Sequence, residues 1–482
     1  MSGSTPGAMP AGVADGVADG MADSVAGAHL EREYDNMLAC VRCGLCLTSC
    51  PTYVLSLHEA EGPRGRVAMA RALTEGHLTL TADLIQHEQS CLICDACSAV
   101  CPAGVEMDPL QVALRAAIEA QLRRPWRQRA LRSVVFRLLF RHMAVLRLVV
   151  RLLGLYQALG VQWLARRLGI LQALGLASAD AFLPPIPRRL LVPRGEVYPA
   201  ERSPTEPAPR VALFAGCVMS TALAELDCAT IRVLQRAGCD VVNTAGQGCC
   251  GALNAHEGDL DGMKELARRN IRAFERDPGA PIIVNSAGCG AMLKDYARHF
   301  RDDPEWVARA SAFSARVRDV TEFLTGRALP IQQALPVTAT FQDPCHLAHA
   351  QGITQQPRAL LKAIPELEVR EMRESALCCG SAGIYNLTHP AESRKLQQRK
   401  LDQALATGAA MIVTANPGCL LQLRAGLAER RSPVQVKHII EVLDMATAPP
   451  PRHRQNGATA QPARSAQASP RHSGKKGQEG PS

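Results

Sequence analysis

The chain carries one cysteine pattern twice, as Cys40-Val-Arg-Cys43-Gly-Leu-Cys46-Leu-Thr-Ser-Cys50-Pro51 and as Cys91-Leu-Ile-Cys94-Asp-Ala-Cys97-Ser-Ala-Val-Cys101-Pro102. Three cysteines at intervals of three let a tight loop wrap one cuboid iron–sulfur cluster, whereas the fourth, before proline, reaches the other cluster. Structural zinc is the alternative, but zinc needs four ligands per site and has no use for a third cysteine and a Cys-Pro in both copies. The spacing therefore predicts two [4Fe–4S] clusters with crossed ligation: Cys40, Cys43, Cys46 and Cys101 hold one, and Cys91, Cys94, Cys97 and Cys50 hold the other.

Clusters of this kind carry single electrons. We therefore expect residues 31–110 to form a helical bis-[4Fe–4S] ferredoxin-type domain that conducts electrons, since nothing near its cysteines suggests a substrate pocket. Gly44 leaves room for backbone approach in the first loop, and Asp95 takes its place in the second.

Length and composition predict a globular protein of several domains. The chain has 482 residues, of which 47% are hydrophobic, so it can bury real cores. Its 18 cysteines cluster in short spacings and no secretory signal precedes them, so we expect a reduced, cytoplasmic setting. Residues 1–30 are expected to be a flexible leader, and residues 448–482, rich in Pro, Ser, Arg, Gln and Gly, a disordered tail.

Residues 111–183 predict a basic amphipathic helical bridge. Its arginines at 137, 141, 147 and 151 fall within an arc of about 120° on a helix. Only 14 uncharged residues separate Arg151 from Arg166, fewer than the roughly 18 that span a bilayer. Two interpretations stay open: a solvated basic face on a helix packed against its own protein, or a helix that docks on a membrane surface or a partner. The Pro-rich residues 184–209 are expected to be a linker.

The formal net charge of +9 does not identify a partner by itself, because nucleic acid, an anionic membrane surface and acidic proteins all fit it. A redox-sensing scaffold that binds nucleic acid is the weakest hypothesis, since much of the charge lies in the bridge and the tail. We expect no nucleic-acid partner.

The rest of the chain is an internal repeat. Each copy contains a short apolar strand before a cysteine, a Cys-Cys-Gly (CCG) segment, and a second apolar strand before Gly-Cys, and corresponding cysteines are offset by 128, 129 and 130 residues. Apolar strands alternate with helical segments, which predicts a duplicated α/β unit over residues 210–330 and 331–447. The overall fold class is therefore a multidomain α+β and α/β protein.

Each repeat offers four thiols that could converge on one metal centre. The single cysteine and the Gly-Cys of each repeat lie at the expected carboxyl ends of strands, where helix N-termini favour thiolates, and the adjacent Cys-Cys pair can offer two sulfurs to one metal centre. The two sets are Cys217, Cys249, Cys250 and Cys289, and Cys345, Cys378, Cys379 and Cys419. Two interpretations stay open: at least one repeat holds a further cluster or metal, or these cysteines are buried small residues with a purely structural role.

Cys228 and Cys239 lie outside the pattern and are expected in the core. His346 and His349 are polar neighbours of the cysteines or structural histidines with satisfied hydrogen bonds.

The double ferredoxin motif followed by two CCG domains resembles the iron–sulfur subunits of glycolate oxidase, D-lactate utilisation systems, anaerobic glycerol-3-phosphate dehydrogenase and heterodisulfide reductase. The resemblance to the glycolate oxidase iron–sulfur subunits is closest and covers residues 35–445. It rests on Gly62-Pro-Arg-Gly-Arg66, Pro344-Cys-His-Leu-Ala-His-Ala-Gln351, Cys378-Cys-Gly-Ser-Ala-Gly-Ile-Tyr385, Leu387-Thr-His-Pro390 and Met411-Ile-Val-Thr-Ala-Asn416.

This resemblance implies a subunit of a glycolate dehydrogenase complex that oxidises glycolate to glyoxylate. FAD would sit only on two flavin-type partner subunits, and this chain would pass their electrons to an acceptor such as quinone, with peripheral contact to the cytoplasmic membrane face. The chain shows no Gly-rich dinucleotide-binding fingerprint, which agrees with a flavin that is bound by the partner subunits. No residue of this chain is expected to be catalytic.

One departure from the heterodisulfide reductase pattern matters. There the last cysteine begins a Cys-x-x-Cys, whereas Met292 and Gln422 stand at those positions here. Five-thiolate cluster binding and direct disulfide reduction are therefore in doubt, and a four-ligand site remains open. The alternatives to glycolate are an iron–sulfur subunit of a D-lactate or glycerol-3-phosphate dehydrogenase, or a CCG-cluster disulfide reductase.

Overall fold

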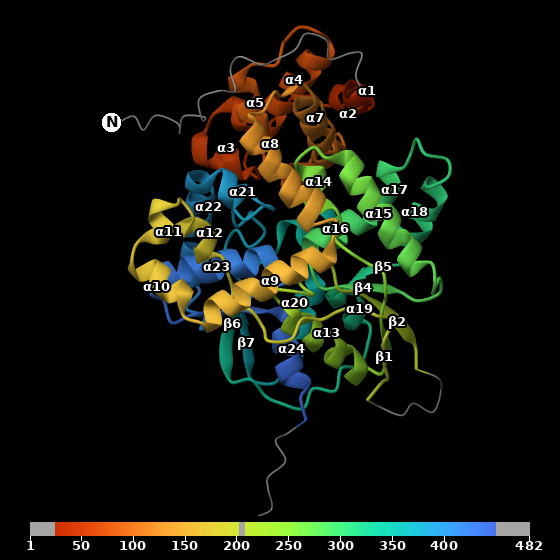
Figure 1. The fold of residues 1–482 in the computed structure, drawn as a ribbon, viewed down its shortest axis with the longest axis vertical. Coiled ribbons are helices and arrows are strands. Elements are labelled where there is room, and N and C mark those ends of the chain that lie inside the picture. Colours follow the sequence, from red (N-terminus) through yellow and green to blue (C-terminus); the bar gives the residue numbers. More distant parts are fainter. Residues whose placement is uncertain (1–24, 202–207, 450–482) are drawn as a thin grey trace, which may run out of the picture. The chain divides into compact units, whose positions relative to one another are not determined.

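The computed structural model describes residues 25–201 and 208–449. The expected tail, and most of the expected leader, lie outside these residues. Within the stretch expected as a leader, residues 25–30 belong to a helix, and Leu30 is buried in the N-terminal core. Figure 1 follows the elements along the chain, from the red helices α1–α3 to the blue helices α22–α24.

The N-terminal region is helical, and both cysteine motifs lie in its loops. The first motif ends where Cys50 precedes Pro51 at the start of a helix, a position that suits proline because its missing N–H has no partner there. Gly44 and Asp95 both adopt left-handed backbone, with φ of +85° and +61°. The two loops thus turn alike, and Asp tolerates this conformation better than most residues. The helices are α1 (Val25–Glu31), α2 (Tyr34–Leu38), α3 (Pro51–Ser56), α4 (Pro63–Thr74), α5 (Ala82–Gln89), α6 (Ala96–Ala99) and α7 (Met107–Gln121), with a 3₁₀ turn, η1 (Glu59–Glu61).

The bridge is a series of short helices, which corrects the expectation of one amphipathic helix. The chain leaves helical geometry at His142, which has φ −115° and ψ 89°, so Arg137 and Arg147 lie on different elements. Gly160 and Gly169 adopt left-handed backbone and separate the following helices, as glycine commonly does after a helix C-terminus. The elements are α8 (Trp126–Arg132), the π-helix η2 (Ser133–Leu139), α9 (Met143–Ala158), α10 (Val161–Arg167), α11 (Ile170–Ala173) and α12 (Ala177–Ala181).

None of the helices in the described ranges is, alone, long and apolar enough to cross a membrane. Helices α9 and α10 meet the length and composition criteria only as a pair, and they are bent by 68° at the break between them.

The first repeat is built on a five-stranded sheet of order β1-β3-β2-β4-β5. Strands β2 to β5 run parallel, and β1, which lies in the expected linker, adds an antiparallel edge to β3. The strands are β1 (Val197–Tyr198), β2 (Arg210–Phe214), β3 (Asp240–Asn243), β4 (Ile282–Val284) and β5 (Val317–Asp319). The helices are α13 (Ala224–Arg236), α14 (Ala252–His256), α15 (Leu260–Phe274), α16 (Ala287–Lys294), α17 (Tyr296–His299), α18 (Val307–Ser314) and α19 (Val320–Thr325).

The second repeat has a fully parallel sheet of order β7-β6-β8-β9, which matches β3-β2-β4-β5 strand for strand. Its strands are β6 (Val337–Phe341), β7 (Leu367–Arg370), β8 (Met411–Thr414) and β9 (Gln435–His438). Its helices are the π-helix η3 (His346–Ala350), α20 (Gln355–Lys362), α21 (Tyr385–Thr388), α22 (Pro390–Leu405), α23 (Pro417–Glu429) and α24 (Ile439–Thr447). The predicted mixture of helices and sheets is confirmed.

The two repeats pack on each other reciprocally. Helix α13 of the first packs on α24 of the second, and α20 of the second packs on α19 of the first (Figure 1). Arg236 reaches across the first of these contacts to Asp444 at 2.8 Å. Side chains from both sheets share one continuous hydrophobic core, which includes Leu213, Phe341 and Leu443. Each repeat thus uses the same two helices to contact the other, as two copies related by a two-fold axis do. Corresponding edges of the two sheets can therefore face one another.

Candidate functional site

The first four predicted ligands line one cavity. Cys40, Cys43 and Cys46 come from the first loop, and Cys101 comes from the end of the second motif. Cys43 is exposed and the other three are partly buried. The backbone N–H of Val105 donates to Cys101 Sγ at 3.4 Å, the kind of contact that tunes a cluster sulfur. This cavity lies near the surface.

The other four line a second cavity. Cys91, Cys94 and Cys97 come from the second loop, and Cys50 comes from the end of the first motif. Cys50, Cys91 and Cys94 are buried, and the Ile93 N–H donates to Cys91 Sγ at 3.4 Å. Cys97 also lines the first cavity, so the two cavities adjoin. The structure brings together the sulfurs that the crossed assignment groups, while ligation itself stays a prediction.

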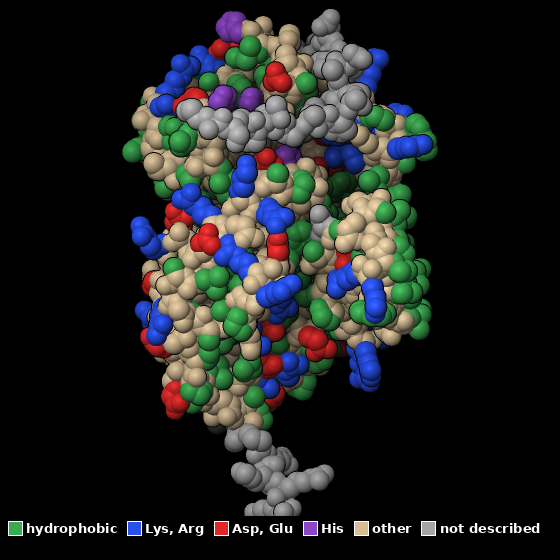
Figure 2. All heavy atoms as spheres, turned by 90° about the vertical axis from the view of Figure 1, so that its left-hand side faces the viewer, with side chains coloured by type: hydrophobic (Ala, Val, Ile, Leu, Met, Phe, Trp, Pro, Cys, Tyr) green, Lys and Arg blue, Asp and Glu red, His purple; other side chains and the backbone are tan. Residues whose placement is uncertain are grey.

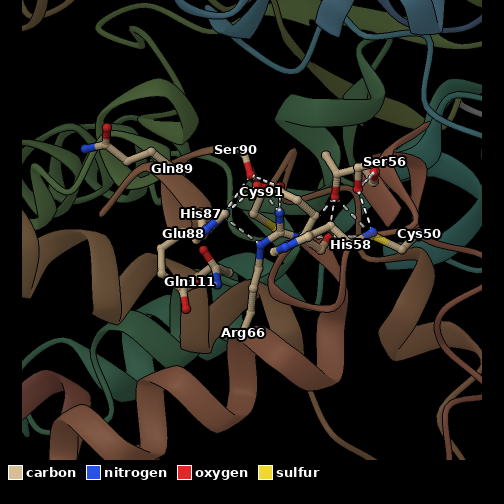
Figure 3. A network of polar contacts seen from close by, with 12 residues as sticks. Cys50, Ser56, His58, Arg66, His87, Glu88, Gln89, Ser90, Cys91 and Gln111 are labelled. Carbon is tan, nitrogen blue, oxygen red and sulfur yellow. Dashed lines mark hydrogen bonds and ion pairs between the residues drawn. The ribbon is translucent and has the colours of Figure 1, made fainter. Parts of the chain in front are cut away.

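Arg66 backs the second cavity with a buried positive charge. Its side chain is 1% exposed, pairs with Glu61 at 2.8 Å, and donates to Ser90 Oγ at 2.8 Å. It also lies 4.0 Å from Cys50 Sγ. Figure 3 shows Arg66 reaching from α4 into this network. Burial opposes its charge, but the nearby Cys91 and Cys50 thiols and acidic groups hold the pKa of Arg66 above its ordinary value, so the guanidinium stays charged.

Glu88 is a second buried ionisable group near this cavity. It is fully buried and accepts a hydrogen bond from Gln111 at 2.7 Å. Burial raises the pKa of Glu88 to about 7, although Arg66 opposes the shift. Sequence analysis missed the roles of both residues, although Arg66 belongs to the Gly62–Arg66 segment that carried the family resemblance.

The loop of the second cavity contacts the second repeat directly. His346 Nε2 lies 2.7 Å from the Ile93 carbonyl oxygen, and Leu92, Cys94 and Ala96 pack in one cluster with Cys378. Burial and then the neighbouring Cys345 raise the pKa of Cys94. The second ferredoxin-type cavity is therefore next to the cysteines of the second repeat.

All eight repeat cysteines line one shared cavity of about 260 Å³. The single cysteine and the Gly-Cys cysteine of each set follow the carboxyl ends of β2, β4, β6 and β8, as predicted, whereas the Cys-Cys pairs lie in longer loops after β3 and β7. What the sequence did not reveal is that the two sets face the same space, because this follows from the reciprocal packing of the repeats.

Within each set the thiols approach one another closely. Cys250 Sγ lies 3.3 Å from Cys289 Sγ, and Cys379 Sγ lies 3.3 Å from Cys419 Sγ. The other thiols of each set are also in contact, since the Cys217 thiol donates a hydrogen bond to Cys249 and the Cys378 thiol donates one to Cys345. A hydrogen bond from Cys378 and the nearby His346, working against burial, lower the pKa of Cys345 to about 7.

The donor chemistry of these sites is sulfur, which suits iron–sulfur clusters. In residues 25–201 and 208–449, no group of three or more His, Cys, Asp or Glu side chains has the geometry to hold a single metal ion.

The residues that were predicted to lie outside the cysteine sets are buried or hydrogen-bonded within the fold. Cys239 is fully buried in the core shared by the repeats, and Cys228 packs against that core. His349 Nε2 lies 3.1 Å from the Ala376 carbonyl oxygen. Met292 and Gln422 are buried, and Gln422 donates to Ser393 Oγ at 2.9 Å.

The two repeats differ in the buried polar residue that lies next to their thiols. Lys400 of α22 is buried and donates to the Ser375 carbonyl at 3.1 Å, and its charge acts on Cys378, Cys379 and Cys419. In the first repeat, buried Asn270 of α15 donates to the Cys249 carbonyl at 2.8 Å. Lys400 carries no sequence signal beyond a lysine among helical residues, so sequence analysis could not single it out.

Family models match most of the chain. A 4Fe-4S dicluster domain matches residues 36–105, a glycolate oxidase iron-sulfur subunit linker region matches residues 127–183, and a cysteine-rich domain named CCG matches residues 211–294 and 339–424.

Curated relatives agree with these matches. The chain is 38% identical to the probable glycolate oxidase iron-sulfur subunit of Bacillus subtilis (strain 168), over 84% of this chain and 93% of that one. It is 33% identical to the glycolate oxidase iron-sulfur subunit of Escherichia coli (strain K12), over 86% of this chain and 95% of that one. Lactate utilization protein A of Bacillus thuringiensis (strain Al Hakam) is 30% identical over 49% of this chain and 98% of its own length. The chain therefore belongs to the family of glycolate oxidase iron–sulfur subunits.

Proposed function

We propose that this chain conducts electrons in a glycolate dehydrogenase complex, from the flavin of partner subunits to an acceptor outside the chain. Oxidation of glycolate to glyoxylate releases two electrons and two protons, and iron–sulfur clusters accept electrons singly. The observation that carries the proposal is the pair of adjoining cavities lined by the eight cysteines of the two ferredoxin motifs, with Cys97 lining both.

The eight ferredoxin cysteines would hold two [4Fe–4S] clusters in the crossed arrangement. The exposed Cys43 supports electron uptake at the first cavity, where Val41 and Leu45 are also exposed and offer an apolar rim to a partner. The contact between His346 and the Ile93 carbonyl supports onward transfer from the second cavity toward the repeats.

We further propose that at least one repeat holds another cluster on its four cysteines. The close rows of thiols in both repeats support this. Gln422 is held by Ser393 and Asn386 where a fifth cysteine would lie, which favours a four-ligand site over the five-thiolate type.

The partners in this proposal are two flavin-type subunits, which alone carry FAD, a quinone acceptor, and the cytoplasmic face of the membrane. Nucleic acid is not among them.

Membrane contact is supported by the bridge, where Trp126, Leu152, Trp163 and Leu168 are each more than half exposed. Arginines lie among them, and Arg167 stacks on Trp163 at 5.2 Å. Aromatic and basic side chains together suit an anionic membrane surface. Figure 2 shows hydrophobic side chains gathered along the right-hand edge of one face, with Lys and Arg between them.

The test is glycolate-dependent reduction of a dye by the purified complex, with and without this chain. We expect activity with glycolate to require the chain, and D-lactate to be the poorer donor. Undiminished glycolate-dependent dye reduction without the chain would refute the proposal. Anaerobic iron and sulfide analysis tests the repeats: more than about eight irons per chain supports a further cluster, and about eight refutes it.

A further inference from the structure

Lys400 and Asn270 occupy corresponding positions in the two repeats, on helices α22 and α15. They are offset by 130 residues, as are Cys289 and Cys419 of the two cysteine sets. Both side chains are buried, with exposures of 1% and 0%. The second repeat therefore places a basic side chain where the first repeat places a neutral amide.

Lys400 differs from the other buried basic residues because it has no acidic partner. Three Lys or Arg side chains are buried in residues 25–201 and 208–449. Arg66 pairs with Glu61 at 2.8 Å. Arg236 pairs with Asp444, also at 2.8 Å. Lys400, the third, donates only to backbone carbonyl oxygens in this part of the chain. A buried charge without a counter-charge is unfavourable, because burial removes the water that would solvate it.

The acidic side chains around Lys400 already have basic partners. Asp343 pairs with Arg358 at 2.7 Å, and both of its oxygens are used. Glu374, whose carbonyl oxygen accepts from Lys400, pairs through its carboxylate with Arg399 at 2.6 Å. The groups left to balance the Lys400 charge are three cysteines of the second set: Cys379, Cys378 and Cys419.

Cysteines that hold iron would supply the missing negative charge. Each thiol loses its proton when it binds a metal, so the ligands are thiolates. Four thiolates around a [4Fe–4S] core leave a net negative charge. Burial lowers the pKa of Lys400, and the sulfurs of the second set oppose that shift. A cluster at these sulfurs and the Lys400 ammonium would thus each provide the counter-charge that the other needs.

The amide at the corresponding position of the first repeat makes only neutral hydrogen bonds. Asn270 Nδ2 donates to the Cys249 carbonyl at 2.8 Å, and its Oδ1 accepts from the Gly248 N–H at 2.9 Å. The neighbouring Arg269 is exposed and donates to the Gly246 carbonyl, so water screens its charge. Within the described residues, the first set therefore has no buried cation to balance an anionic cluster.

The two sets also have different neighbours. Cys217 and Cys249 of the first set pack in an apolar cluster with Met143 of the bridge. Cys378 of the second set packs in one cluster with Cys94, a predicted ligand of the second ferredoxin-type cavity. The second set therefore adjoins the cavity from which electrons would arrive.

We propose that the further cluster belongs to the second repeat and that Lys400 is the positioning residue that supplies its buried counter-charge. The inference rests on the proposed function, which places another cluster in at least one repeat. Lys400 favours the reduced form of this cluster, because reduction adds an electron to a site that is already negative. The four corresponding cysteines of the first repeat remain thiols.

The location is tested by iron and sulfide analysis of the full chain purified without oxygen. Cys419→Ser and Cys289→Ser change corresponding positions and form a matched pair. We expect about twelve irons in the wild type and in Cys289→Ser, and about eight in Cys419→Ser, because each cluster holds four. Iron lost from Cys289→Ser, or about sixteen irons in the wild type, would overturn the assignment.

The role of Lys400 is tested by a redox titration of Lys400→Gln, which removes the charge but keeps an N–H donor for the carbonyls. Electron paramagnetic resonance should show a lower midpoint potential for the signal that Cys419→Ser removes, with the other two unchanged. Lys395→Gln, at an exposed position of the same helix, is the matched control and should leave all three unchanged. Circular dichroism checks the fold of both variants.

Loss of that one cluster from Lys400→Gln, with both ferredoxin-type signals retained, would also support the role of Lys400. Three unchanged potentials in this variant would overturn it. About eight irons in the wild type would remove the further cluster from the proposed function, and this inference with it. About twelve irons, of which Cys289→Ser loses four, would leave the proposed function intact and exclude only the second repeat.

Discussion

The two ferredoxin motifs share every cysteine position, yet their cavities differ in exposure and charge. The first is open, with exposed Cys43 and the exposed apolar residues Val41 and Leu45 at its rim. The second is closed, is lined by buried Arg66, and packs against the second repeat. Exposure, hydrogen bonds and nearby charge set the potential of an iron–sulfur cluster. One motif can therefore serve two roles, electron uptake at the surface and relay toward the interior.

The largest effects should come from the cysteines themselves. Cys43→Ser and Cys94→Ser should each remove about four irons, from the first and the second cavity respectively. Cys50→Ser should reproduce the loss in Cys94→Ser, and Cys101→Ser the loss in Cys43→Ser. Electron paramagnetic resonance of the four reduced variants distinguishes the two signals. If Cys50→Ser instead removes the signal that Cys43→Ser removes, the crossed arrangement is wrong.

Arg66→Met should destabilise the chain by about 3 kcal/mol, because it breaks a buried ion pair and leaves Glu61 with only His87 and Ser90 as partners. Thermal unfolding at a fixed heating rate measures the change, since proteins of this size often unfold irreversibly. Arg394→Met is the matched control, because Arg394 pairs with Glu429 at the surface, lines neither cavity and should barely alter the midpoint. Equal midpoints for the two variants would show that the buried network adds no stability.

Glu88→Gln should alter the pH dependence of stability. The folded pKa of Glu88 is about 7 and its ordinary value is 4.5, so between these values the folded chain holds a proton that the unfolded chain has lost. Stability from this group is therefore present below pH 4.5 and lost as pH rises through 7. Between pH 6 and pH 8 the wild type should lose about 1 kcal/mol that Glu88→Gln does not lose. The same pH profile in both proteins would contradict the burial of this carboxyl.

Arg298→Met should have the smallest effect. Arg298 of α17 pairs through both Nη atoms with Glu106, just beyond the first cavity, at 2.7 Å. Both groups are partly exposed, so water screens the pair and its loss should cost less than about 1 kcal/mol. Thermal midpoints in low and high salt measure this. A loss as large as that of Arg66→Met would mean that surface pairs, not the buried network, fix the ferredoxin-type domain.

The local patterns were predictable because short-range geometry decides them. The position of Pro51 at a helix start and the left-handed turns at Gly44 and Asp95 follow from residue type and spacing. The duplicated sheet was recognisable because the cysteines recur at nearly constant offsets.

Long-range features were not predictable in the same way. The shared cysteine cavity depends on how α13 meets α24, which no motif encodes. The break at His142 also escaped, because the arginine periodicity continues across it while the backbone does not. Buried Lys400 shows the same limit, since burial of a charge depends on the neighbours that tertiary packing supplies.

A redox titration followed by electron paramagnetic resonance tests the central claim most directly, with Cys43→Ser identifying the signal of the first cluster. An isolated positive charge about 6 Å from a cluster stabilises its reduced form by roughly 2–3 kcal/mol at an effective dielectric constant near 20, on the order of 100 mV, and the Glu61 carboxylate paired with Arg66 offsets part of this. We predict that the second cluster has the higher potential and loses most of that difference in Arg66→Met. Equal potentials in the wild type, or a lower potential at the second cluster than at the first, would contradict electron flow from the first cluster to the second.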